Sequence, residues 1–384
     1  MIRFRYKSVL VFVLLLSANA PGQSPPRQTE QVRAYYESAQ KFEAAGNWQQ
    51  AEQTWRAVLK LSNNDARAWT NLGVVLNRQE KTDEALEAWK QAIALDPKLA
   101  GAHFNIGLTL VRKGEYGGAI TPLRQALVLE PNNDGARRAL AIALMGQEKY
   151  QEASREIAQL LFHAPEDAAL LELAARSFMQ QRRYQEAATV LQRRLRVPNT
   201  TAFLWSQYGD ALDGAGRTPE ALEAYKNAVK LDPESTITRY GLGYLHWKLY
   251  QYDDAERELL EVLRRSPNDP RASFTLGDLY LTRGDAQRAL PLLETAQASY
   301  PNEFDTRFAL GRALVLTGKL KEGVEELRTA VKLDDTIADG HFQLGRALMK
   351  TGLTEEGKRE LQKAQALHDR QRQNEAERYR KKLP

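Results

Sequence analysis

Cysteine is absent from the 384-residue sequence. The absence excludes disulfide bridges, thiol chemistry and the attachment of a lipid to a cysteine. An excess of charge is also lacking: 54 basic residues face 49 acidic ones, and the 54 fall to 51 without Arg3, Arg5 and Lys7 of the amino-terminal segment. A nucleic-acid partner favours a strong basic stripe. We therefore expect no nucleic-acid partner.

The amino-terminal apolar run is too short to cross a membrane. Val9 to Leu16 would rise about 12 Å as a helix, against the roughly 30 Å of a bilayer's hydrocarbon core. The run follows three cations and precedes Ala18-Asn19-Ala20, small residues of the kind that a signal peptidase needs. This pattern predicts a signal peptide over residues 1–20 and export to the periplasm or the exterior, with a bacterial envelope as the setting. An uncleaved anchor is the alternative.

The motifs of catalysis and of metal binding are missing as well. None of the five histidines has a partner at the spacing of a metal site, and no Gly-x-Ser-x-Gly elbow or glycine-rich phosphate loop occurs. Paired acids such as Asp210 and Asp213 are common on helical surfaces. We expect no enzyme activity, no cofactor and no metal.

The chain does contain a 34-residue pattern, which runs ten times from Val32 to Gln371 without insertion or deletion. The twentieth position of the pattern is always alanine or glycine. The eighth position is always small: Ala39, Gly73, Gly107, Ala141, Ala175, Gly209, Gly243, Gly277, Gly311 and Gly345. The twenty-fourth is always bulky: Trp55, Trp89, Leu123, Ile157, Leu191, Tyr225, Leu259, Leu293, Leu327 and Leu361. Small residues on both helices of a pair would let the helices approach while the large side chains fill the gaps.

Each unit predicts two helices joined by a tight turn. In the second unit, Trp69 and Leu72 belong to the apolar stripe of a first helix, and Trp89 and Ala92 to that of a second. The turn begins with glycine in six units, which supplies a left-handed backbone: Gly46, Gly114, Gly216, Gly284, Gly318 and Gly352. Proline ends the second helix in six units: Pro97, Pro131, Pro165, Pro233, Pro267 and Pro301. Pro198 is shifted by one position, so we expect a looser join after the fifth unit.

With these features the array resembles the tetratricopeptide repeat family, whose 34-residue unit carries a W, L-G, Y, A, F, A, P pattern. The second unit matches it nearly in full with Trp69, Leu72, Gly73, Leu76, Ala85, Trp89, Ala92 and Pro97. The resemblance implies an all-α fold, an α-solenoid of ten helix-turn-helix repeats wound as a right-handed superhelix. The expected organisation is a signal peptide (1–20), a flexible linker (21–31), the repeat array (32–371) and a helical extension or cap (372–384). The cations of that last segment are interpreted as solvated, or else as a contact for acidic lipid or an acidic partner.

A second face of the first helices is the expected binding surface. At about 100° per residue, positions 2, 5, 9 and 12 of each unit lie away from the core stripe. The resemblance implies that this face lines a concave groove and receives an extended peptide or a partner helix, so that the expected partners are proteins or peptides, and alternatively a glycan. The candidate groove residues are Phe104, Leu108, Arg138, Ile142, Asp210, Tyr240, Tyr244, Trp247, Phe274, Phe308, Arg312, Phe342 and Arg346.

Two interpretations of the groove aromatics stay open. Phe274, Phe308 and Phe342 form a ladder at position 5, which either binds a partner or packs neighbouring first helices together. Tyr244 and Trp247 belong to a broader aromatic platform that suits peptide or sugar rings. The side chains of a chaperone-type carboxylate clamp are not found at the matching positions.

The sequence therefore predicts an exported, non-catalytic scaffold for protein–protein interaction that supports the assembly of an envelope or secretion complex. A carbohydrate-handling accessory subunit of a polysaccharide secretion system is the alternative. A regulatory arm of an enzyme remains possible only if the catalyst is a separate polypeptide.

Overall fold

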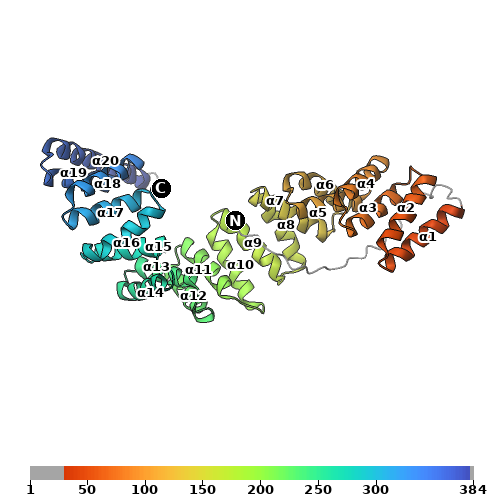
Figure 1. The fold of residues 1–384 in the computed structure, drawn as a ribbon, viewed down its shortest axis with the longest axis horizontal. Coiled ribbons are helices and arrows are strands. Elements are labelled where there is room, and N and C mark those ends of the chain that lie inside the picture. Colours follow the sequence, from red (N-terminus) through yellow and green to blue (C-terminus); the bar gives the residue numbers. More distant parts are fainter. Residues whose placement is uncertain (1–29, 381–384) are drawn as a thin grey trace. The chain divides into compact units, whose positions relative to one another are not determined.

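The computed structural model describes residues 30–380, which form twenty helices and contain no strand (Figure 1). The all-α repeat fold is thus confirmed. The predicted signal peptide and residues 21–29 of the predicted linker lie outside the described residues, as do residues 381–384. Odd-numbered helices are the first helices of the repeats, and even-numbered helices are the second.

The chain divides into two compact units, one ending at Glu148 and the other beginning at Lys149. The described part of the first unit contains α1 (Glu30–Ala44), α2 (Trp48–Leu61), α3 (Ala66–Arg78), α4 (Thr82–Leu95), α5 (Ala100–Lys113), α6 (Tyr116–Leu129) and α7 (Asp134–Gly146). The second contains α8 (Tyr150–His163), α9 (Ala168–Gln180), α10 (Tyr184–Arg196), α11 (Ala202–Gly214), α12 (Thr218–Leu231), α13 (Thr236–Lys248), α14 (Tyr252–Arg265), α15 (Pro270–Thr282), α16 (Ala286–Ser299), α17 (Phe304–Leu316), α18 (Leu320–Leu333), α19 (Ala338–Lys350) and α20 (Thr354–Arg380).

In seven of the ten repeats the two helices approach closely because position 8 carries glycine where position 24 carries its large side chain; the first, fourth and fifth repeats carry alanine there. A Cβ added at Gly73 would lie 2.4 Å from the Trp89 ring, and one added at Gly107 would lie 2.4 Å from Leu123. Such distances are shorter than any real contact, so only glycine allows this spacing of the helices. The same pairing recurs at Gly209, Gly243, Gly277, Gly311 and Gly345.

The turn between the helices of a repeat contains one left-handed residue in all ten repeats. The six glycines predicted for this role have φ between +71° and +86°. In the other four repeats a residue with a side chain adopts the same conformation, which ordinarily favours glycine. These residues are Glu80, Glu148, Arg182 and Tyr250.

The join between successive repeats combines a proline with a helix cap. Each proline at position 32 lies between two helices, as predicted. In six joins the residue two places after position 32 has a short polar side chain that accepts a hydrogen bond from a backbone N–H of the next first helix, which satisfies one of its unpaired donors. Asp65, Asn133, Asp167, Thr201, Ser235 and Asp269 form these caps.

A buried arginine closes the join after the fifth repeat, where position 32 lacks proline. Arg194 on α10 donates to Glu172 on α9 at 2.7 Å, and its other nitrogens donate to the backbone carbonyls of residues 197, 198 and 199. Asn199 has a φ of +66°, which turns the chain there. The guanidinium thus satisfies carbonyls beyond the helix end, and the join is held where the sequence had indicated a loose one.

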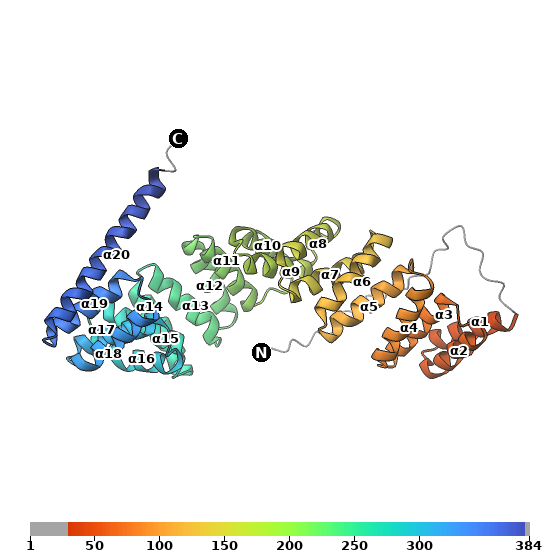
Figure 2. The ribbon, with the colours of Figure 1, turned by 90° about the horizontal axis from the view of Figure 1, so that it is seen from above.

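The last helix is longer than the others of its unit. α20 continues without a break through the end of the tenth repeat, and Figure 2 shows it projecting past α19. Ala364 is its last buried residue, and residues 371–377 are all exposed. These exposed turns carry charged and amide side chains, so they extend the array into solvent without adding to its core.

Candidate interaction surface

The predicted groove residues lie on first helices that touch one another. In the second unit α11 contacts α13, α13 contacts α15, α15 contacts α17 and α17 contacts α19, while α5 contacts α7 in the first unit. None of the thirteen candidates is fully buried. Four of them are exposed: Ile142, Asp210, Phe342 and Arg346. The other nine are half-buried: Phe104, Leu108, Arg138, Tyr240, Tyr244, Trp247, Phe274, Phe308 and Arg312.

In the first unit the candidates serve packing at least in part. Phe104 on α5 lies against the start of α7, where a Cβ added at Gly135 would lie 3.3 Å from Phe104 Cζ. The ring therefore joins the two first helices. Leu108 and Arg138 are half-buried beside it in the repeat pattern, and Ile142 keeps 37 % of its surface exposed.

In the second unit three aromatic rings of α13 form a stacked row. Tyr240 and Tyr244 have ring centroids 6.2 Å apart, and Tyr244 and Trp247 are 5.7 Å apart, each pair inclined by 29°. Tyr240 and Trp247 also pack against the buried cluster of α14 and α15, and the nearby Trp247 opposes the rise that burial causes in the pKa of Asp278. Tyr244 is half-buried between them. Of the three, Tyr244 is therefore the ring that packing uses least.

The phenylalanine ladder divides between the two interpretations. Phe274 and Phe308 pack against buried clusters, and Phe308 also stacks on Phe304 at 5.4 Å. Phe342 keeps 37 % of its surface exposed. Packing thus explains most of the first two rings, and the third remains a surface residue.

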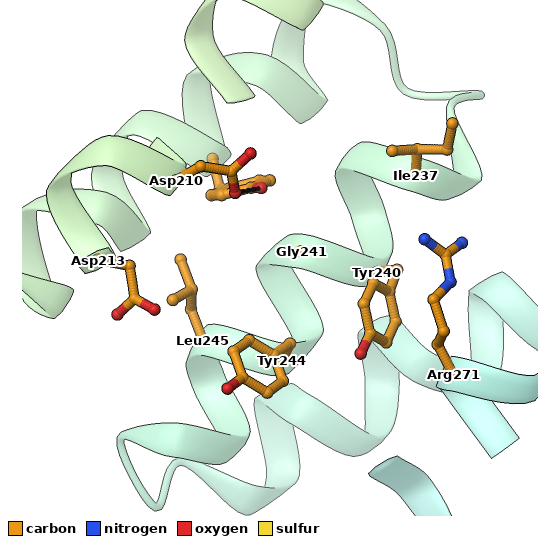
Figure 3. A pocket seen from close by; sticks show the side chains of 9 residues that line it. Asp210, Asp213, Ile237, Tyr240, Gly241, Tyr244, Leu245 and Arg271 are labelled. Carbon is orange, nitrogen blue, oxygen red and sulfur yellow. Dashed lines mark hydrogen bonds between the residues drawn. The ribbon is translucent and has the colours of Figure 1, made fainter. Parts of the chain in front are cut away.

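A recess opens between α11, α13 and α15. Figure 3 shows Asp210 and Asp213 on one side of it, Tyr240 and Arg271 on the other, and Tyr244 between them. Its volume is about 260 Å³. Pockets for drug-sized molecules are larger, at roughly 300–1,000 Å³, so this recess has the size of one or two side chains.

The floor of the recess is the ring of Tyr225 on α12, held between two glycines. A Cβ added at Gly209 on α11 would lie 2.6 Å from this ring, and one added at Gly241 on α13 would lie 2.1 Å from it. The ring is therefore fixed from both sides. Its hydroxyl donates to Asp210 Oδ1 at 2.5 Å. Packing thus sets the position of the carboxylate that faces the recess.

The charges around the recess differ in how they are paired. Asp213 accepts hydrogen bonds from Lys248 Nζ at 2.7 Å and from the Thr218 hydroxyl at 2.7 Å. Arg271 forms an ion pair with Asp269 at 2.9 Å and lies 4.7 Å from the centroid of the Tyr240 ring. Within residues 30–380 no lysine or arginine forms an ion pair with Asp210.

Burial shifts the protonation of these groups. Asp210 is an exposed residue, but the helices around the recess leave its carboxylate less water than an open surface would. Burial therefore raises the pKa of Asp210; the Tyr225 hydroxyl opposes this shift and the charge of Asp213 adds to it. Burial also raises the pKa values of Tyr225 and Tyr240, so both hydroxyls stay protonated at neutral pH.

The far end of the surface is basic. Arg312 lies 5.5 Å from the Phe308 ring centroid, and Arg346 lies 5.6 Å from that of Phe342. Burial raises the pKa of Asp278, and the nearby charge of Arg312 opposes the shift. The first helices of this unit thus present carboxylates at α11 and guanidinium groups over aromatic rings at α17 and α19.

Four residues of this region escaped the candidate set. Arg271 and the exposed Phe203 occupy position 2, which the groove pattern includes, so their positions were a sufficient signal. Tyr225 stands at a core position, where a hydroxyl among Leu, Ile and Trp signals a need for a hydrogen-bond partner. Gly241 replaces a larger residue at position 6 and marks the close approach to Tyr225.

Neither metal ligands nor a membrane span are found in the part of the chain that the structure describes. No group of three His, Asp or Glu side chains there is arranged to hold an ion. No helix among residues 30–380 combines the length and apolar character needed to cross a bilayer.

The sequence matches four family models for this type of repeat. One described as a tetratricopeptide repeat matches residues 208–270, 240–304 and 274–338. Two others of the same description match residues 110–177 and 169–202, and one described as a TPR repeat matches residues 75–114. The chain belongs to the tetratricopeptide repeat family. Proteins with such repeats bind protein partners, which is the coarse function that the membership supports.

One curated protein is similar to the chain over a short segment. Cellulose synthase operon protein C of Salmonella typhimurium is 30 % identical over 84 residues, which are 22 % of this chain and 7 % of that protein. The chain thus spans a small part of the relative's length.

Solved structures of similar fold are more distant in sequence. MamA from Desulfovibrio magneticus RS-1 is 24 % identical, with a TM-score of 0.41 over 46 % of this chain and 99 % of its own. The Cut9–Hcn1 hetero-tetramer is 14 % identical, with a TM-score of 0.48 over 88 % of this chain and 87 % of its own. Naa15/Naa10 bound to HypK is also 14 % identical, with a TM-score of 0.48 over 88 % and 64 %.

Proposed function

We propose that the protein is a non-catalytic scaffold that binds a peptide segment or partner helix along the first helices α11 to α19. The observation that carries this proposal is the row of aromatic and charged side chains on those helices that packing leaves partly open. Asp210, Phe342 and Arg346 are its exposed members, and Tyr244 is the half-buried ring of α13 that packing uses least. Aromatic and arginine side chains supply most of the binding energy of protein interfaces.

The setting that we propose is a bacterial envelope, where the scaffold would support the assembly of an envelope or secretion complex. Support comes from the amino-terminal sequence, in which three cations, an apolar run and Ala18-Asn19-Ala20 follow one another. The composition agrees with this setting, since a protein without cysteine folds alike in oxidising and reducing compartments.

Selection from a displayed library of random dodecapeptides tests the binding proposal. The full chain should enrich a family of peptides, and Tyr244→Ala should lose them while keeping the melting temperature of the parent. Tyr250→Ala is the matched control, because Tyr250 belongs to the same repeat but lies in the turn and is 78 % exposed. Equal enrichment by all three proteins would place binding elsewhere. Trp247 is unsuitable for the test, since it packs on the core.

A second candidate is a carbohydrate-handling accessory subunit of a polysaccharide secretion system. The observation that favours it is the 84-residue similarity to cellulose synthase operon protein C. Stacked rings such as Tyr244 and Trp247 also suit sugar faces. A glycan array decides between the two: binding of a defined oligosaccharide that Tyr244→Ala abolishes would favour this function, and an empty array would favour the peptide scaffold.

A further inference from the structure

We propose that the recess between α11, α13 and α15 receives one lysine or arginine side chain of the bound segment, with Asp210 as its counter-ion. This inference rests on the proposed function and names the chemistry of the partner at one place on the surface. The occupant is a basic residue of a peptide or helix that lies along the first helices.

Charge complementarity selects the sign of the occupant. Lys248 neutralises Asp213, and Asp269 neutralises Arg271, both through ion pairs. Asp210 receives only a neutral hydroxyl, from Tyr225. The recess therefore keeps one uncompensated negative charge among the described residues, and a cation that enters it pairs with a carboxylate already partly removed from water. An acidic occupant would instead meet two carboxylates of α11.

The walls select the shape of the occupant. The side chains of Tyr240 and Tyr244 line the recess, and Leu245 and Ile237 add apolar atoms to its walls. Such walls cover the methylene stem of a long basic side chain while its head reaches the carboxylate. The volume of about 260 Å³ admits such a side chain and excludes a folded element. A short cation-bearing residue would leave the walls unfilled.

The Tyr225 ring at the floor of the recess preorganises the Asp210 carboxylate for binding. Tyr225 is clamped by Gly209 and Gly241, so the carboxylate that accepts its hydroxyl has a fixed orientation. A fixed counter-ion reduces the entropy lost when the charge pair forms. Repeats with leucine or isoleucine at position 24 have no hydroxyl there that could donate a hydrogen bond to a carboxylate. Tyr225 of the sixth repeat supplies this hydroxyl, and the repeats with an aliphatic side chain at position 24 do not.

The experiment uses the peptides that the full chain enriches at pH 7.5. The aligned peptides should share one lysine or arginine. Replacement of this residue, in a peptide where it is lysine, by norleucine keeps the methylene stem and removes the charge, and should weaken binding about tenfold or more. Asp210→Asn should cause a similar loss with the parent peptide and little further loss with the norleucine peptide. Asp253→Asn is the control, because Asp253 is an exposed acid on the second helix α14.

The outcomes separate this inference from the function beneath it. Two results would overturn the inference that the recess binds a basic side chain while leaving the scaffold proposal intact. In the first, the enriched peptides share no basic residue. In the second, Asp210→Asn binds these peptides as well as the parent protein does. Enriched peptides with a shared acidic residue overturn it in favour of Arg271 or Arg312. A library from which the full chain enriches nothing removes the scaffold proposal and this inference together. Circular dichroism of Asp210→Asn shows whether any loss comes from misfolding.

Discussion

At the scale of the residue, Asp210 is held where ionisation costs stability. Its pKa is raised by burial, so the folded chain binds its proton more tightly than the unfolded chain does. The protonated carboxyl stabilises the fold below the unfolded pKa of about 4, and this contribution is lost as pH rises through the raised folded pKa. A charge kept at such a cost is typical of a binding site.

We therefore expect Asp210→Asn to melt at the same or a higher temperature than the parent at pH 7.5, because asparagine still accepts the Tyr225 hydroxyl and carries no charge. At pH 4 the advantage should shrink, since the raised pKa of Asp210 leaves more of the parent carboxyl protonated there than at pH 7.5. Thermal denaturation followed by circular dichroism at both pH values measures this. A variant that melts several degrees below the parent at pH 7.5 would show that the carboxylate serves the fold.

The structural role of a residue could be predicted better in the core than on the inner surface. Gly73 and Trp89 could be assigned to a contact from the sequence, because strict repetition leaves only one way to pack small against large. Trp247 could not be assigned, since an aromatic on the inner face can pack, bind or do both. The structure shows it packed on the core. The difference depends on neighbouring repeats, which the position within one repeat does not reveal.

At the scale of the element, the turn offers a direct test of backbone strain. Arg182 has a φ of +57° in a position that six other repeats fill with glycine. Arg182→Gly should stabilise the chain by about 0.5–1 kcal/mol. Glycine relieves the strain of the left-handed backbone, and the greater conformational entropy of glycine in the unfolded chain offsets part of this gain. Gly216→Arg is the reverse change and should destabilise by a similar amount. Urea denaturation measures both, and a loss on Arg182→Gly would mean that the side chain makes contacts of its own.

The contact of α12 with α13 offers a test of packing. Gly241→Ala should destabilise the chain by about 1–3 kcal/mol, because its Cβ would overlap the Tyr225 ring. Tyr225→Leu removes that ring, and adding it to Gly241→Ala should recover part of the loss. The double mutant should then lose less stability than the sum of the two single losses, by on the order of 1 kcal/mol. Urea denaturation of the parent and the three variants measures this coupling energy. Additive effects would show that the two residues do not press on each other.

Helices and turns were predicted well, and the joins less so. The 34-residue period predicts the helix positions because each element recurs in the same register. Proline, which lacks an amide donor, and glycine, which adopts the left-handed conformation, mark where the helices end. The closure after the fifth repeat depends on Arg194, whose side chain reaches three carbonyls that no periodic pattern marks. A residue that departs from the pattern therefore has to be located in space before its role can be read.

At the scale of the whole molecule, the sequence predicted the array and its inner face, because stacked hairpins bury their apolar stripes only against neighbours. It did not indicate the division after Glu148, where the period continues unchanged. Nor did it indicate that the exposed polar and aromatic residues would gather around one recess. Asp210, Tyr240 and Arg271 come from three successive repeats, and only the stacking brings them together.

Site-specific photo-crosslinking in the cells of origin tests the central claim most directly. A photoreactive amino acid in place of Tyr244 should yield one discrete protein adduct, because this ring lies on the surface that holds the partner. The same amino acid in place of Tyr250, in the turn of the same repeat, should yield none. Adducts of equal intensity at both positions, or none at Tyr244 while Tyr250 crosslinks, would contradict the account of a scaffold that binds along its first helices.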